Sequence, residues 1–252
     1  MSVTHPLSAR LIEARRTHKF LALDSSITCK DSTESYAVQA EVAAGLNTTV
    51  AGWKVGLLPD GAGGWGAPVF ACDSIADGGT FKFDGDMNSV KVEAELGVRF
   101  GRDLPARPGK AYSREEILEA VSEIFAGIEL VGTRFKQGVE LPFATRLADN
   151  YANNAYAAGP GLKDFRKLDL SQIRCVLKQD GKVISDRIGG HQQGDPMSPV
   201  IAFANSQSDR FGGIKAGQFI TTGTLTKPYD LSTAVTLEAE LEGVSRITLK
   251  TA

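Results

Sequence analysis

The sequence is poor in cysteine and lacks the spacings with which cysteines bind zinc. Its 252 residues include three cysteines, Cys29, Cys72 and Cys175, and no CxxC or Cys/His pattern surrounds them. The sequence therefore predicts no zinc site. An odd number of widely separated thiols favours a reducing compartment.

Long hydrophobic runs and a strong net charge are also missing. No stretch approaches the roughly 18 consecutive apolar residues that a membrane span needs, and the N-terminal residues lack the hydrophobic run of a signal peptide. The formal net charge of −2 gives no electrostatic basis for binding nucleic acid or an anionic membrane. We therefore expect a cytoplasmic protein with neither partner, whose chemistry rests on local clusters of charge.

The hydrophobic content of 42% and charged content of 23% are typical of a soluble globular protein. Helices are predicted at about 8–23, 35–46 and 114–128, the last with a capping box, and from Pro196 to before Gly212. Strands are predicted at 50–58, 90–100, 234–241 and 245–249, with a hairpin turn at Asp180-Gly181. This order indicates an α+β fold, which we expect to form a single domain over residues 1–252 with a helical N-terminal lead of about 1–50.

A glycine-rich stretch at residues 59–68 formally satisfies the dinucleotide-binding pattern GxGxxG through Gly61, Gly63 and Gly66. That pattern binds a pyrophosphate only where it opens a helix. Here Pro68 and a short run typical of a strand follow instead. The stretch is therefore interpreted as a mobile loop over a pocket or a long turn.

Paired carboxylates on a predicted strand are the first candidates for chemistry. Glu93 and Glu95 are two residues apart, so both side chains leave the same face, about 7 Å apart at the backbone. Such a pair can bind a hard divalent cation such as Mg2+ or Mn2+. Glu238 and Glu240 have the same spacing in another predicted strand, so spacing alone does not distinguish a metal site from a solvated face.

Two further charged residues lie among apolar neighbours. Glu129 is either a third metal ligand or the buried partner of a cation such as Arg134. Lys54 either extends its ammonium group into a pocket, where it would stabilise an enolate or move a proton, or reaches water from an edge strand. His191 has no nucleophile motif beside it, and we do not expect it to be catalytic.

The order of these segments resembles the 2-keto-4-pentenoate hydratase family of the fumarylacetoacetate hydrolase superfamily. The matching segments are residues 52–57 (GWKVGL), 92–95 (VEAE), Glu129, 148–150 (ADN) with Gly159, 194–196 (GDP), and 216–217 (AG) with 222–224 (TGT). They extend over about residues 35–231. Each motif is weak alone, but six in this order are specific.

The resemblance implies a fold, a cofactor and a set of site residues. The fold would be a mixed β-roll with peripheral helices, and the protein would be a homo-oligomer. Glu93, Glu95 and Glu129 would bind Mg2+ or Mn2+, and Lys54 would be the active-site lysine. The predicted substrate-binding residues are Asp149, Asn150, Thr222 and Gly223. Glu238 and Glu240 would then take no part in the site.

The reaction implied by the resemblance is hydration of a small unsaturated 2-oxo acid of the 2-hydroxypenta-2,4-dienoate type through a metal-stabilised enolate, in a pathway such as aromatic ring meta-cleavage. Two alternatives stay open: decarboxylation of a 2-oxo-enedioate of the 4-oxalocrotonate type, and a non-catalytic 2-oxo acid binding or accessory subunit. The chain departs from the family pattern at Leu58, Val69, Ala152 and Asn153. The Glu–His dyad of the superfamily's hydrolases is not recognisable, which disfavours hydrolysis.

Overall fold

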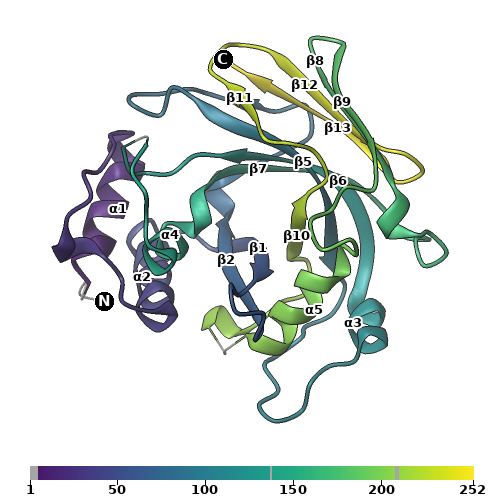
Figure 1. Ribbon diagram of the computed structural model, residues 1–252, viewed down its shortest axis with the longest axis horizontal. Helices are drawn as coiled ribbons and strands as arrows, with labels where there is room; N and C mark the ends of the chain where they lie inside the picture. Colours follow the sequence, from purple (N-terminus) through teal and green to yellow (C-terminus); the bar gives the residue numbers. More distant parts are fainter. Residues whose placement is uncertain (1–4, 137, 208–209) are drawn as a thin grey trace.

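The computed structural model describes residues 5–136, 138–207 and 210–252, and in these residues two β-sheets form the centre of the molecule (Figure 1). The larger sheet contains β1 (Val50–Leu57), β2 (Gly64–Phe70), β3 (Ser74–Ile75), β5 (Val90–Phe100), β6 (Val121–Val131), β7 (Asn153–Leu162), β10 (Phe219–Thr224) and β11 (Tyr229–Leu231). Its order is β2-β1-β10-β5-β6-β7-β3, with β11 also paired to β5. The sheet curls (Figure 1), which confirms the predicted α+β fold with a mixed β-roll.

The smaller sheet packs against one side of this curled sheet. It contains β4 (Thr80–Phe81), β8 (Arg174–Gln179), β9 (Lys182–Ile188), β12 (Thr236–Leu241) and β13 (Ser245–Thr251), in the order β4-β13-β12-β8-β9. Apolar side chains of both sheets, such as Ile128, Leu237 and Ile247, are fully buried in one core cluster. This burial fixes β5 and β6 in place, and those strands carry the carboxylates.

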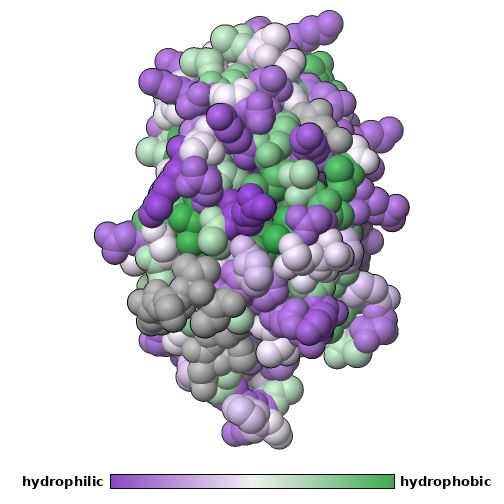
Figure 2. Space-filling model, turned by 90° about the vertical axis from the view of Figure 1, so that its left-hand side faces the viewer, coloured by the Kyte–Doolittle hydropathy of each residue, from purple (hydrophilic) through white to green (hydrophobic). Residues whose placement is uncertain are grey.

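Five α-helices among the described residues surround the sheets: α1 (Pro6–Thr17), α2 (Ser32–Gly45), α3 (Arg114–Ala120), α4 (Phe143–Ala148) and α5 (Met197–Ser206). The first two pack together, and α4 packs on α2. Figure 2 shows this side of the molecule, where polar side chains predominate and apolar ones lie between them. No helix among the described residues is long and apolar enough to cross a membrane.

Two predicted helices end earlier than expected. The first stops at Thr17 because His18 adopts a left-handed conformation with φ 55°. The capping box of Ser113 and Glu116 is confirmed, but its helix ends at Ala120. The following residues 121–131 form β6, so the prediction of helix to 128 is wrong. They are rich in β-branched and aromatic residues and pair with a strand on each side, which favours extended backbone.

The glycine-rich stretch is a strand over much of its length, which corrects its interpretation as a loop. Residues 64–68 belong to β2, which pairs with β1 and is buried throughout. Gly64 and Gly66 let α5 approach, since a Cβ at Gly66 would lie 2.1 Å from the Phe203 ring. The sequence also gave no indication of α4, β7 or β10 as regular elements.

Other local predictions are confirmed. Asp180 and Gly181 join β8 to β9 with φ values of 50° and 77°, as a two-residue hairpin turn requires. The predicted strand at 90–100 matches β5, and that at 50–58 matches β1 to within one residue. The helix after Pro196 begins as expected but ends at Ser206.

The close contact between β2 and α5 gives a first test of the fold. Gly66→Ala should lower the free energy of unfolding by about 1–3 kcal/mol, because the added methyl group must displace the Phe203 ring. Gly132→Ala is the matched control, since its methyl group would meet nothing closer than 3.3 Å. Chemical denaturation measures both. Equal losses in the two variants would contradict the packing described here.

Candidate functional site

A cavity of about 490 Å3 opens between neighbouring strands of the curled sheet and the segments that cover them. Its wall includes residues of β1, β2, β5 and β10, together with α4, the turn that follows α4, and the loop before α5. Among the lining residues are Lys54, Glu93 and Glu95, and also Thr222 and Gly223. Five of the eight site residues predicted from the sequence therefore line one cavity.

The three predicted metal ligands lie together in the structure. Glu93 and Glu95 project from the same face of β5, and Glu129 on β6 stands directly opposite Glu93 in the strand register. One carboxylate oxygen from each lies within 4.8 Å of the others. Glu95 and Glu129 are fully buried. Like charges opposite one another destabilise a sheet, so this arrangement needs a compensating cation.

Lys54 supplies part of that compensation. Its Nζ lies 2.9 Å from Oε1 of Glu129, and its largely buried side chain reaches the carboxylates from β1. Asn153 donates a second hydrogen bond from Nδ2 to the same oxygen, at 2.8 Å. The expected alternative partner of Glu129, Arg134, instead pairs with Asp149 at 3.1 Å. Glu129 is thus oriented toward the cluster by two polar partners.

The electrostatics of the cluster show an excess of negative charge. Burial, followed by the charges of Glu129 and Glu93, raises the pKa of Glu95 well above its ordinary value. Burial also raises the pKa of Glu93, against the opposing charge of Lys54. For Lys54 burial acts to lower the pKa, but the three carboxylates outweigh it and the pKa is raised. The lysine is therefore a charged ammonium group.

This cluster fits a divalent metal ion. With all three carboxylates ionised, the ammonium group of Lys54 would leave two negative charges, which one divalent cation would neutralise. Without such a cation, the raised pKa of Glu95 favours its protonated form. The Oε2 atoms of Glu95 and Glu129 are buried and have no hydrogen-bond partner among the described residues. Carboxylate oxygens are the ligands that hard divalent cations prefer. The carboxylate pair of Glu238 and Glu240 lies instead on β12 in the smaller sheet.

The remaining predicted site residues fall into two groups. Thr222 and Gly223 lie at an irregularity in the β10–β5 pairing, between Thr221 and Thr224, and line the cavity. Asp149 and Asn150 are buried outside the lining. Asp149 accepts hydrogen bonds from the Thr133 hydroxyl and the Arg134 backbone, and Asn150 donates one to the Pro68 carbonyl. A substrate contact for these last two stays a prediction.

Asp149 and Asn150 hold a turn that presents an aromatic ring to the cavity. Residues 150–152 have three successive φ values of 49°, 49° and 60°, a conformation that costs energy for residues other than glycine. The turn packs the Tyr151 ring on Trp65, with ring centroids 4.0 Å apart. Both rings line the cavity. No local sequence pattern indicates this wall, because its formation depends on the strained turn.

His191 also lines the cavity, which sequence reasoning did not anticipate. Its Nε2 lies 2.8 Å from the Thr222 carbonyl, and its Nδ1 accepts a hydrogen bond from the Gln193 backbone. The imidazole is thus neutral with its proton on Nε2, and burial lowers its pKa. With both nitrogens engaged, His191 fixes the loop before α5 against β10.

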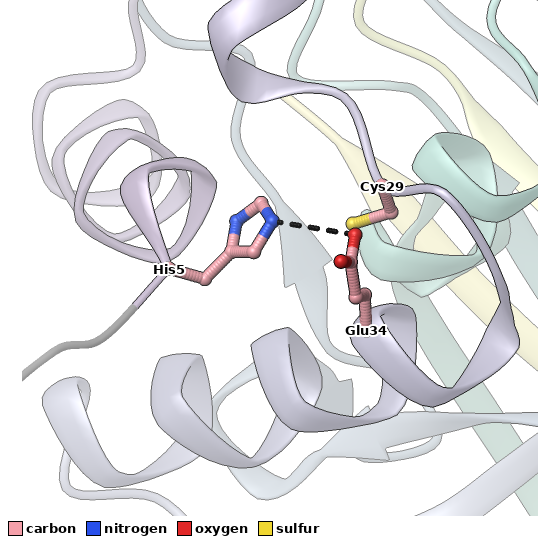
Figure 3. A group of neighbouring side chains, drawn as sticks. All are labelled: His5, Cys29 and Glu34. Atoms are coloured by element: carbon pink, nitrogen blue, oxygen red, sulfur yellow. Dashed lines mark ion pairs between the residues drawn. The ribbon is translucent and has the colours of Figure 1, made fainter.

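A second cluster of potential metal ligands lies among the N-terminal helices (Figure 3). The His5 ring at the start of α1 faces the Glu34 carboxylate at the start of α2, with Nε2 and Oε2 3.8 Å apart, and the Cys29 sulfur lies beside them. Nδ1 of His5 accepts a hydrogen bond from the Leu7 backbone. A neutral imidazole with that acceptor carries its proton on Nε2 and has no lone pair there for a metal. Burial raises the pKa of Cys29 to about 11, so this thiol is protonated.

Comparison with known proteins places the chain in a family. Residues 70–250 match the Fumarylacetoacetate (FAA) hydrolase C-terminal family, and the chain belongs to it. A 2-keto-4-pentenoate hydratase from Paraburkholderia xenovorans is 29% identical over 64% of this chain and 58% of that protein. One from Burkholderia vietnamiensis is 27% identical over 96% of this chain and 94% of that protein. A 4-oxalocrotonate decarboxylase from Pseudomonas putida is 24% identical over 70% of this chain and 65% of that protein.

Solved structures show the same fold. A 4-oxalocrotonate decarboxylase from Pseudomonas putida, complexed with magnesium and adipate, superposes with a TM-score of 0.82 at 20% identity, over 100% of this chain and 99% of that one. A fumarylpyruvate hydrolase from Pseudomonas aeruginosa, in complex with Mn2+ and pyruvate, gives a TM-score of 0.52 at 14% identity, over 79% of this chain and 88% of that one.

The family match and these relatives confirm the resemblance found in the sequence. The match to the first of these relatives spans 58% of that protein's length. A divalent metal cofactor agrees with the carboxylate cluster and with the ions bound by the structural neighbours.

The carboxylate cluster can be tested by metal binding. Glu95→Gln keeps the size of the side chain and removes its charge, so affinity for Mn2+ should fall by about a hundredfold or more. The rise in melting temperature that Mn2+ gives the parent protein should be lost as well. Without metal, the variant should be no less stable than the parent, because a buried carboxylate among like charges is removed.

Glu238→Gln is the matched control, because it removes the same charge from a strand with the same ExE spacing. Calorimetric titration and thermal unfolding should give parent values for it. If the two variants lost Mn2+ affinity equally, Glu95 would have no specific part in metal binding.

Proposed function

We propose that this protein is a hydratase that depends on Mg2+ or Mn2+ and adds water to an unsaturated 2-oxo acid of the 2-hydroxypenta-2,4-dienoate type. The observation that carries the proposal is the cluster of Glu93, Glu95 and Glu129 with Lys54 beside one cavity, where two buried carboxylate oxygens have no hydrogen-bond partner among the described residues. The 2-keto-4-pentenoate hydratases among its relatives support the same reaction.

The metal ion, when bound, supplies a Lewis acid that draws electron density from the 2-oxo group of the substrate. The three carboxylates hold that ion, and the hydrogen bonds from Lys54 and Asn153 hold Glu129 in its orientation. The Nζ of Lys54 adds positive charge where the 2-oxo oxygen becomes negative, and it is placed to give a proton to the carbon chain or to take one.

The other walls of the cavity control what reaches this centre. The Trp65 and Tyr151 rings offer an apolar surface for the unsaturated carbon chain and limit the access of water. The loop held by His191 forms another part of the cavity wall. A single water molecule admitted beside the distal double bond would then be the reactant, and bulk solvent would be kept from the strongly charged cluster.

The departures from the family pattern lie in different places. Val69 is fully buried among aromatic side chains and does not line the cavity, and Leu58 packs in a separate apolar cluster. Ala152 lines the cavity, while Asn153 holds Glu129. Val69 thus lies away from the cavity lining, whereas Leu58 packs in the cluster that contains Trp65 and Tyr151. None of the four departures replaces a predicted metal ligand.

Decarboxylation of a 2-oxo-enedioate is the second candidate. The 4-oxalocrotonate decarboxylase relatives at 24% identity support it, and the same Lewis acid serves that reaction, because loss of CO2 also leaves negative charge on the 2-oxo group. A non-catalytic 2-oxo acid binding subunit is the third. The metal and the lysine would serve each of these reactions equally, so analysis of the products is needed to distinguish them.

Product analysis is the direct experiment. With Mg2+ or Mn2+ and 2-hydroxypenta-2,4-dienoate, we expect a 4-hydroxy-2-oxo acid that is heavier by one water, and chelation by EDTA should stop its formation. Mass spectrometry of the product and CO2 release from a 2-oxo-enedioate distinguish hydration from decarboxylation. Metal-dependent oxalate binding without turnover of either substrate would indicate the accessory subunit, and no metal binding would contradict all three.

A substitution can distinguish a catalytic role of Lys54 from a role in metal binding. Lys54→Met should lower kcat by about 10²–10⁴-fold through loss of charge and proton transfer at the 2-oxo group. Its affinity for Mn2+ should be kept or increased, because a positive neighbour is removed from the carboxylates. Lys250→Met, at an exposed position of β13 in the smaller sheet, is the control and should leave both quantities unchanged. Loss of Mn2+ binding in Lys54→Met would mean that the lysine serves only to hold Glu129.

A further inference from the structure

The cavity contains a cation for which the proposed hydration has no use. Arg146 lies on α4 and lines the same cavity as the carboxylate cluster. Apart from Lys54 it is the only lysine or arginine among the described lining residues. No ion pair joins it to a carboxylate of the described residues, whereas Arg134, twelve positions earlier, pairs with Asp149.

Arg146 and Lys54 lie near the same aromatic ring. The Arg146 guanidinium carbon is 5.6 Å from the Tyr151 ring centroid, and the Lys54 Nζ is 5.7 Å from it. The two cations are therefore at most about 11 Å apart, a distance that a short carbon chain with an anionic group at each end can bridge. One end of such a molecule would meet the metal and Lys54, and the other would meet Arg146.

The two cations differ chemically, and the difference fits Lys54 to the reacting end of the ligand and Arg146 to its far end. Lys54 is already engaged with Glu129 and lies beside the reacting end. Arginine presents a planar set of donors that matches a carboxylate with two parallel hydrogen bonds. Tyr151 and Trp65, which line the same cavity, would contact the carbon chain.

We propose that Arg146 binds a second, distal carboxylate, so that the preferred substrate is an unsaturated 2-oxo acid with a carboxylate at its far end, which 2-hydroxypenta-2,4-dienoate itself lacks. This inference rests on the proposed function, since it concerns the far end of the same 2-oxo acid. It makes Arg146 the residue that sets specificity at that end, and it applies to hydration and decarboxylation alike.

Binding of unreactive analogues tests the proposal on the metal-loaded protein. The probes are 2-oxopentanedioate and 2-oxohexanedioate, each compared with the monocarboxylate of the same length, and oxalate as a ligand without a distal end. The parent protein should bind at least one of the dicarboxylates about ten- to a hundredfold more tightly than its monocarboxylate partner. This comparison needs no variant.

Arg146→Gln should abolish the preference and leave the affinities for oxalate and for the monocarboxylates at parent values. Arg166→Gln is the matched control, because Arg166 also lies over an aromatic ring but outside this cavity, and it should keep the preference. Thermal unfolding establishes that both variants are folded.

The outcomes distinguish a failure of the proposed function from a failure of the role proposed for Arg146. If the metal-loaded parent protein does not bind oxalate, the proposed function fails. If it binds oxalate and the monocarboxylates but shows no preference for a dicarboxylate, the function stands and the role of Arg146 is overturned. If Arg146→Gln weakens every ligand equally, including oxalate, Arg146 acts at the metal end or only supports Tyr151, and the inference is again overturned.

Discussion

The structure depends on an uncompensated negative charge that the fold holds at the edge of its core. Glu95 and Glu129 are buried, Glu93 stands opposite Glu129, and one lysine offsets a single charge of the three. Transfer of such charges out of water is costly unless they are paired. The surrounding sheet must therefore be stable enough to keep the cluster together without its metal, and a bound divalent cation removes the repulsion.

The pairing of β5 with β6 stabilises the sheet that holds the carboxylate cluster. The two strands form a long antiparallel pair, from Lys91 opposite Val131 to Phe100 opposite Val121. Most of their other side chains are apolar and fully buried, and the smaller sheet covers part of their surface. Register is strongly specified under these conditions, because a shift by one residue would turn Glu93 and Glu95 to the opposite face. The register that buries the core thus also assembles the cluster.

The sequence predicts the parts of this arrangement that leave a local pattern. β5 alternates apolar and polar residues, and the capping box and the Asp180-Gly181 turn are short-range signals, so each is recognised correctly. β6 is buried on both faces and loses that alternation, which is why part of it was predicted as helix. Within the ExE motif, spacing alone could not separate Glu93 and Glu95 from Glu238 and Glu240.

The residues that the sequence did not indicate reach the cavity through contacts between distant segments. Asn153 reaches Glu129 only because β7 pairs with β6, where the register shifts beside Leu130. His191 is placed by its hydrogen bond to Thr222, which lies 31 positions later in the chain. The position of the Tyr151 ring depends on three successive residues in the left-handed conformation, which no turn motif in the sequence predicts. Such positions follow from the tertiary structure, and one sequence carries no periodic signal for them.

The two cations of the cavity also show how one site can separate binding from chemistry. An ammonium group is a compact charge that can exchange a proton, and Lys54 has it 2.9 Å from the carboxylate cluster. A guanidinium group keeps its proton at any ordinary pH and is better suited to recognise a planar anion. Because Tyr151 lies within 6 Å of both, the strained turn that carries this ring shapes the wall of the cavity beside both cations. The same turn leads into Asn153, which holds Glu129, so a change there would disturb the carboxylate cluster as well as the binding of the carbon chain.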